Sequence, residues 1–293
     1  MPEFSEYERS LLNLFSENKC FYFEGAQYRV IFADKPTCSS GEPKTDVFVR
    51  CVNINTGVER DIKISYKKDN ADFLENKIKA ERAEELFGVN WRKIISSATK
   101  QLEYVFKNRQ VIFKSKEGRI EEGSITLGWK FEIVNCMSGD LSNEIILTDE
   151  QKQDVYSGIN LGADKRNSIV NGGVVPNSGV ADYILMTDGL IDIQYVIDNI
   201  VSVKNYVQDK KFYFACKALN YRTLHNPPKC DGNRPLAVQV DWSVVDGKLV
   251  SSLDFDHPLE RKGYEMRDKL KEALDFLCVS NTTQLNNTNC SCL

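Results

Sequence analysis

The chain has 293 residues, of which 42% are hydrophobic and 27% charged, and its formal net charge is −4. This is the composition of an ordinary globular protein, and it argues against a fibrous or disordered chain. The apolar runs are far shorter than the roughly 20 residues that cross a bilayer, so we expect no membrane-spanning segment. The first residues, MPEFSEYERS, lack the basic and then apolar pattern of a secretory signal, which predicts a cytoplasmic protein.

The first third of the sequence alternates between helical and strand patterns. Aromatic and β-branched residues around a Glu24-Gly25 break predict a short hairpin over residues 20–33. Two longer strands, Asp46–Ile54 and Glu59–Tyr66, flank the turn residues Asn55-Thr56-Gly57 and predict a second hairpin. Apolar residues three and four apart predict helices over 4–15, 70–86 and 91–106.

Strand patterns predominate after residue 109, and a helix is expected at the end, over Leu259–Val279. These elements predict an α+β fold with an α/β core, in which helices flank a mixed β-sheet and the C-terminal half is rich in strands. We expect a core at 1–150, a β-rich region at 151–280 and a disordered tail at 281–293, with the boundary loosely placed in the loop-like stretch 157–180. A single domain remains an alternative.

Cysteine and histidine usage excludes two common kinds of site. The nine cysteines are widely spaced, apart from Cys290 and Cys292 in the polar tail, so we expect mostly buried, reduced thiols. The sequence holds only two histidines, which argues against a zinc site and against a Ser-His-Asp hydrolase. A metal held by oxygen ligands remains compatible with the sequence.

The second hairpin brings charged side chains together. Residues two apart on a strand share a face. Asp61, Lys63 and Ser65 therefore point one way, and Ile62, Ile64 and Tyr66 point into the core. Fourteen residues separate Asp46 from Asp61, enough for two strands and a turn that return the first carboxylate toward the second. We therefore expect two carboxylates and one ammonium group to converge.

Such a convergence suits phosphodiester hydrolysis. Mg²⁺ prefers oxygen ligands and keeps several waters, so Asp46, Asp61 and the backbone carbonyl of Ile62 suffice to hold it. A bound Mg²⁺ polarises the phosphoryl oxygen and orients an attacking water. Lys63 beside the phosphate stabilises the negative charge of the transition state.

The set Asp46, then Asp61-Ile62-Lys63 on a hairpin, resembles the PD-(D/E)xK nuclease superfamily, which includes most type II restriction endonucleases. The resemblance implies a restriction-endonuclease-like fold, an Mg²⁺-dependent, site-specific cleavage of double-stranded DNA, and catalytic roles for Asp46, Asp61 and Lys63. The motif's proline is displaced, because Pro43 stands three residues before Asp46. Many such families add a glutamate from a preceding helix, and the candidates are Glu6, Glu8, Glu17 and Glu42.

Further polar residues are candidates for DNA contact. Lys67, Lys68 and Asn70 follow the second strand of the hairpin, where they would meet the phosphate backbone. Two segments rich in Gly, Pro and hydrogen-bond donors are candidates for base recognition. The full set of expected DNA-binding residues is Lys67, Lys68, Asn70, Lys77, Lys165, Arg166, Asn220, Arg222 and Arg234.

Cutting both strands of a palindromic site needs two centres related by a two-fold axis, so we expect a homodimer. Two alternatives stay open. One is a structure-selective or repair nuclease with the same chemistry, and the other is a non-catalytic α+β nucleic-acid-binding protein whose hairpin acids are surface charge.

Overall fold

The computed structural model describes residues 6–67, 73–76, 78–187, 189 and 191–293. The chain divides into two compact units. Unit 1 comprises Met1–Asp72 and Ile146–Lys210, and unit 2 comprises Phe73–Ile145 and Lys211–Leu293. The chain therefore passes between the units three times, instead of once in the stretch 157–180 as the sequence suggested.

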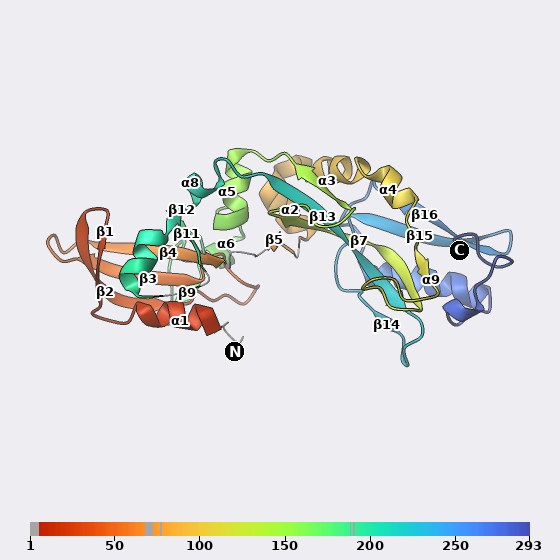
Figure 1. The fold of residues 1–293 in the computed structure, drawn as a ribbon, viewed down its shortest axis with the longest axis horizontal. Coiled ribbons are helices and arrows are strands. Elements are labelled where there is room, and N and C mark those ends of the chain that lie inside the picture. Colours follow the sequence, from red (N-terminus) through yellow and green to blue (C-terminus); the bar gives the residue numbers. More distant parts are fainter. Residues whose placement is uncertain (1–5, 68–72, 77, 188, 190) are drawn as a thin grey trace. The chain divides into compact units, whose positions relative to one another are not determined.

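Unit 1 is built on a six-stranded mixed sheet, whose first four strands are red to orange in Figure 1. All neighbouring strands are antiparallel except β4 and β11, which run parallel. The strands in sheet order are β1 (Cys20–Phe23), β2 (Ala26–Asp34), β3 (Val47–Asn53), β4 (Glu59–Lys67), β11 (Tyr183–Met186) and β12 (Val201–Ser202). Both hairpins expected from the sequence are confirmed.

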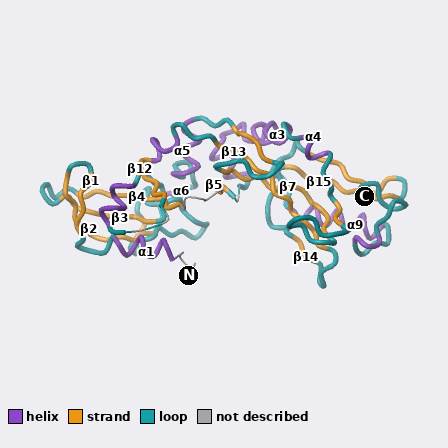
Figure 2. Tube along the Cα trace, viewed as in Figure 1, coloured by secondary structure: helices purple, strands orange, loops and turns teal. Residues whose placement is uncertain are grey.

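The helices of unit 1 are short (purple in Figure 2), and all but the first come from its second segment, Ile146–Lys210. They are α1 (Glu6–Leu14), α5 (Asp149–Ser157), α6 (Ala163–Arg166), α7 (Ile193–Asn199) and α8 (Val203–Val207). A small hairpin, β9 (Ile169–Val170) with β10 (Gly173–Val174), lies in the connection after α6. The first of these helices, α1, confirms the amphipathic pattern, with its buried Leu11 facing the sheet.

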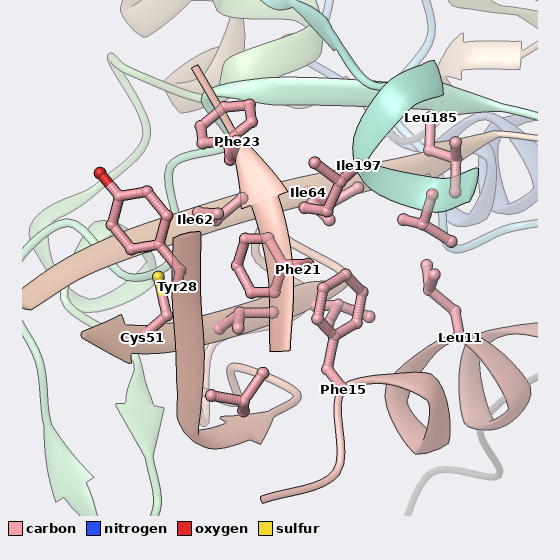
Figure 3. Close-up of a cluster of buried hydrophobic side chains, with 14 of the residues drawn as sticks. Leu11, Phe15, Phe21, Phe23, Tyr28, Cys51, Ile62, Ile64, Leu185 and Ile197 are labelled. Atoms are coloured by element: carbon pink, nitrogen blue, oxygen red, sulfur yellow. The ribbon is translucent and has the colours of Figure 1, made fainter. Parts of the chain in front are cut away.

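One face of the sheet carries the core of unit 1, shown in Figure 3. Ile62, Ile64 and Tyr66 of β4 point into this core, as their alternation predicts. Leu11 and Phe15 cover them from the side of α1. Arg50 of β3 and Asp61, Lys63 and Lys67 of β4 therefore share the opposite face, whereas Arg60 lies at the edge of the core, over the ring of Phe23.

Unit 2 is built on a second, eight-stranded sheet. Its central path is β14 (Lys229–Cys230), β13 (Phe212–Arg222), β7 (Ser124–Val134), β15 (Val238–Val245) and β16 (Lys248–Asp254). Three shorter strands join its two longest, with β5 (Phe73–Glu75) and β6 (Ile112–Phe113) on β7 and β8 (Ser142–Ile145) on β13. Its helices are α2 (Ala80–Phe87), η1 (Gly88–Asn90), α3 (Trp91–Lys100), α4 (Glu103–Lys107), α9 (Gly263–Phe276) and η2 (Thr282–Gln284).

The helix expected over 70–86 is wrong in its first half. Phe73 and Glu75 instead pair with Val134 and Ile133 of β7, and the helix begins only at Ala80. Pairing with a long neighbouring strand is a tertiary interaction, which overrides a local helical pattern. The helix expected over 91–106 is divided into α3 and α4.

The C-terminal tail, expected to be disordered, is ordered. Leu285 is fully buried and Cys290 nearly so. The Leu249 amide of β16 donates to the carbonyl of Asn289 at 2.8 Å, and the Ser291 amide donates back to Leu249 at 3.0 Å. The polar tail thus continues the edge of the unit 2 sheet, because that edge offers backbone partners that composition does not reveal.

The α+β class expected from the sequence is confirmed, and the described helices are all too short or too polar to cross a membrane. All nine cysteines are free thiols. Only Cys51, Cys216 and Cys290 are buried, so the expectation that most are buried is wrong.

Candidate active site

The register of the β3–β4 hairpin decides which charged residues meet. Val47 lies opposite Ile64 and Arg50 opposite Asp61. One step beyond Val47, the same ladder brings Asp46 beside Ser65. Asp61 lies four residues before Ser65 on β4, which places it about 13 Å away at 3.3 Å per residue. The expected convergence of Asp46 with Asp61 and Lys63 is therefore corrected by the register.

Asp61 is engaged by the arginine opposite it. Arg50 donates from Nε to Asp61 Oδ1 at 2.8 Å and from its terminal nitrogen to Oδ2 at 3.0 Å. The guanidinium also lies over the rings of Phe32 and Phe48, which holds its plane. Both carboxylate oxygens of Asp61 are thus occupied by a two-pronged ion pair, which is a structural arrangement.

Lys63 is engaged on the other side of β4. Its Nζ lies 3.2 Å from Asp182 Oδ2 and donates to the carbonyl oxygen of Asn177 at 3.2 Å. Burial raises the pKa of Asp182, and the charge of Lys63 opposes that rise. Lys63 therefore joins β4 to the segment entering β11. Ile62, expected to lend its carbonyl to a metal, pairs with Val49 inside the ladder, away from Asp46.

Asp46 has a different environment, at the end of the sheet where β3 begins and β4 ends. Its Oδ2 accepts from the Tyr66 amide at 2.7 Å and from Ser65 Oγ at 3.3 Å. The Nζ of Lys67 lies 3.8 Å from the same oxygen. Within the described residues, Oδ1 makes no hydrogen bond or ion pair.

The three side chains repeat the predicted motif four residues further along β4. Ser65 and Lys67 share a strand face, as do Asp61 and Lys63, and Asp46 lies beside them. The arrangement is an acid next to Ser-Tyr-Lys, in which Ser65 stands where the motif has its second acid. Ser65 is fully buried, whereas about a quarter of the Lys67 side chain is exposed.

Helix α1 brings a second carboxylate into the electrostatic surroundings of Asp46. Burial raises the pKa of Asp46; the Lys67 charge and the Tyr66 amide lower it in part, and Glu8 raises it further. Glu8 is held at 2.6 Å by Lys35, the residue that follows β2. The ring of Tyr7 stacks on Tyr66 with centroids 6.3 Å apart, which fixes α1 over the end of β4. Of the four glutamates left open by the sequence, Glu8 is the one whose charge acts on Asp46.

The oxygen atoms of Asp46 and Ser65 are suitable ligands for a hard divalent cation. Carboxylate and hydroxyl oxygens are the ligands that Mg²⁺ prefers, and Mg²⁺ keeps several of its waters. A cation would also offset the cost of burying the charge of Asp46, which is the reason that its pKa is raised. Among the described residues, no cluster of three or more Asp, Glu, His or Cys side chains is poised to hold a metal, so such a site depends on water and Ser65 as well.

The remaining predicted contact residues fall in several places. Lys68, Asn70 and Lys77 lie outside the described residues. Lys165 and Arg166 belong to the short helix α6 of unit 1, whereas Asn220 and Arg222 lie on β13 and Arg234 follows β14, all in unit 2. Arg222 makes a two-pronged ion pair with Asp231 at 2.8 and 2.9 Å. The two donor-rich segments therefore belong to different units.

Sequence reasoning missed the partners Arg50 and Asp182, and it took Lys67 only as a phosphate contact. The available signal was the turn, because a hairpin folded about Asn55-Thr56 sets Asp46 beside Ser65 and not beside Asp61. Comparison with known proteins adds no constraint: no family model, curated protein or solved structure matches this chain.

Proposed function

We propose that this chain is an Mg²⁺-dependent endonuclease that cuts double-stranded DNA at specific sites, in the manner of a type II restriction enzyme, with its centre at Asp46 and Lys67. The observation that carries the proposal is the meeting of a carboxylate, only about one fifth exposed, and a lysine, 3.8 Å apart, at the open end of the β3–β4 hairpin. The mixed sheet flanked by helices in unit 1 agrees with the fold that the PD-(D/E)xK resemblance implies.

The roles follow from the contacts. Asp46 would hold the metal through its carboxylate, whose Oδ2 is fixed by the Tyr66 amide and the Ser65 hydroxyl. Glu8 supplies a second negative charge from α1. Bound Mg²⁺ supplies a polarised phosphoryl oxygen and an oriented water. Lys67 places its ammonium group beside the reacting phosphate, where it stabilises the charge that develops in the transition state.

Asp61 and Lys63 have structural roles in this proposal. Each is neutralised by a partner, Arg50 in one case and Asp182 in the other. Removing one partner of a partly buried pair leaves an uncompensated charge, so these pairs stabilise unit 1. They fix the register that sets Asp46 beside Lys67.

The direct test is incubation of the full chain with supercoiled plasmid DNA, with Mg²⁺ or with EDTA. Discrete linear fragments that require Mg²⁺ are expected. Nicking without discrete fragments, or cutting confined to branched DNA, would instead support the repair nuclease. Plasmid left intact under all divalent cations would contradict a nuclease and support the non-catalytic alternative.

A further inference from the structure

Unit 2 contains two adjoining hollows at one end of its sheet. The larger has a volume of about 680 Å³ and lies between the segment after α4, strand β16 and the C-terminal residues. The smaller, about 390 Å³, lies over β7 and β13. Arg109 and Gln110 line both, so the two hollows form one continuous concave surface.

This surface is positively charged, although the chain as a whole is not. Its acidic side chains are Asp140 and Asp231, and the net charge of the chain is −4. Its basic side chains are Lys107, Arg109, Lys114, Arg119, Lys217 and Arg222, which we call the unit 2 cationic surface. Two further acids beside the lining pair with these cations, Glu103 with Lys107 at 2.6 Å and Glu121 with Arg222 at 3.3 Å. The remaining excess of positive charge in a concavity attracts a polyanion locally.

Some of these cations are held by the protein and others are not. Arg222 is paired with Asp231, and Lys217 donates to the hydroxyl of Ser138 at 2.7 Å. Arg109, by contrast, reaches Asp140 at 3.6 Å, and the side chains are 37% and 80% exposed, respectively. Arg119 is exposed and makes no ion pair among the described residues. Arg109 and Arg119 thus keep their guanidinium groups available for a ligand.

Two amide side chains on the same surface are oriented by the fold. Gln110 donates from Nε2 to the Ile112 carbonyl at 2.7 Å, and Asn220 accepts at Oδ1 from the Thr126 hydroxyl at 3.1 Å. In each amide the second polar atom has no partner among the described residues. Asn220 is only 6% exposed, whereas Gln110 is exposed, so Gln110 is the amide that can reach a base edge, where Gln pairs with adenine.

We propose that the unit 2 cationic surface binds double-stranded DNA, with Arg109 and Arg119 on phosphates and with Gln110 on a base edge. The choice of DNA over another polyanion, such as an acidic protein, rests on the proposed function. The residues of the unit 2 cationic surface belong to unit 2, whereas the proposed cleavage centre belongs to unit 1. Unit 2 would therefore select the sequence that unit 1 cuts.

The test is equilibrium binding of a 30-base-pair duplex of randomised sequence in EDTA, which removes any dependence on cleavage. The double variant R109A/R119A should bind at least about tenfold more weakly at 0.1 M salt, and the salt slope should fall by about 2, because two phosphate contacts are lost. The matched control is K93A/K271A, which removes two exposed lysines of unit 2 away from this surface and should bind as the wild type does.

Equal weakening by both double variants would overturn the proposal, because it would mark a general charge effect. Wild-type affinity in R109A/R119A, or failure of the wild-type protein to bind the duplex, would overturn it too. Preferential weakening in R109A/R119A supports it even if plasmid is never cut, in which case only the proposed function fails. Sequences selected from a randomised pool provide a second readout, and Q110A should lose enrichment for adenine at one position.

Discussion

Asp46 and Asp61 lie on neighbouring strands of one hairpin, and their surroundings give them different chemistry. The carboxylate of Asp61 has an arginine across the ladder to neutralise it. About one fifth of the Asp46 side chain is exposed, and its nearest cation, Lys67, is 3.8 Å away. The residue types needed for the site could be predicted from the sequence, and the turn at Asn55-Thr56 carried the signal for their pairing. The partners Arg50 and Asp182 decide which acid-lysine pair stays available, and Asp182 could not be predicted because it lies far along the chain.

The raised pKa of Asp46 predicts a dependence of stability on pH. A carboxyl group whose pKa is higher in the folded state favours folding while it is protonated, and this contribution is lost as pH rises through the folded pKa. Asp46→Asn keeps an acceptor for the Tyr66 amide without the charge. We expect it to raise the thermal midpoint at pH 7 and to match the wild type in acid, by circular dichroism.

Asp61→Asn is the matched control for that experiment. It removes the two-pronged pair with Arg50, whose side chains are each about one third exposed. The loss should lower the free energy of unfolding at pH 7 by about 1 kcal/mol, after allowance for solvent screening. If Asp46→Asn were as destabilising as Asp61→Asn at neutral pH, the account of Asp46 as a strained, site-forming acid would be wrong.

At the scale of elements, local patterns predicted most of what forms locally. The two N-terminal hairpins, α1 and α9 have the expected places, because turn residues and apolar spacing specify them. The failures are β5 and the tail, which are held by strand partners far along the chain. Neither Phe73 nor Leu249 carries a sign of its partner in the adjacent residues.

Because the tail is ordered, replacing a buried side chain within it should lower the free energy of unfolding. Leu285 is fully buried in unit 2, so Leu285→Ala should lower the free energy of unfolding by about 2–4 kcal/mol. Leu293→Ala is the matched control, because that side chain is half exposed and should cost little. Denaturant titration measures both, and equal, small effects would show that the tail is not packed as described.

At the scale of the whole molecule, unit 2 interrupts unit 1 in the sequence. Strand β4 ends before the chain enters unit 2, and β11 lies beside β4 only after the chain has returned. A boundary that the chain crosses three times leaves no single linker in the composition. The sequence therefore predicted the α+β class but not the division into units.

If the protein cleaves both strands of DNA at a specific site, we expect two copies of this chain to bind one duplex. Two identical centres related by a two-fold axis reach both strands of a palindrome symmetrically. Sedimentation velocity with an uncleaved specific duplex should give a complex with two protomers. A single protomer that cuts both strands, with a rate strictly proportional to protein concentration, would exclude the dimer.

The central claim is that the working lysine is Lys67 and not Lys63, and one comparison tests it most directly. Lys67→Ala and Lys63→Ala remove the same group from the same face of β4, four residues apart, and plasmid cleavage with Mg²⁺ is measured for both. Lys67→Ala should lower the rate by at least about a hundredfold, as loss of one transition-state contact does. Lys63→Ala should lower the thermal midpoint and keep most of the cleavage rate of the folded protein. Loss of cleavage in Lys63→Ala with retention in Lys67→Ala would contradict the account.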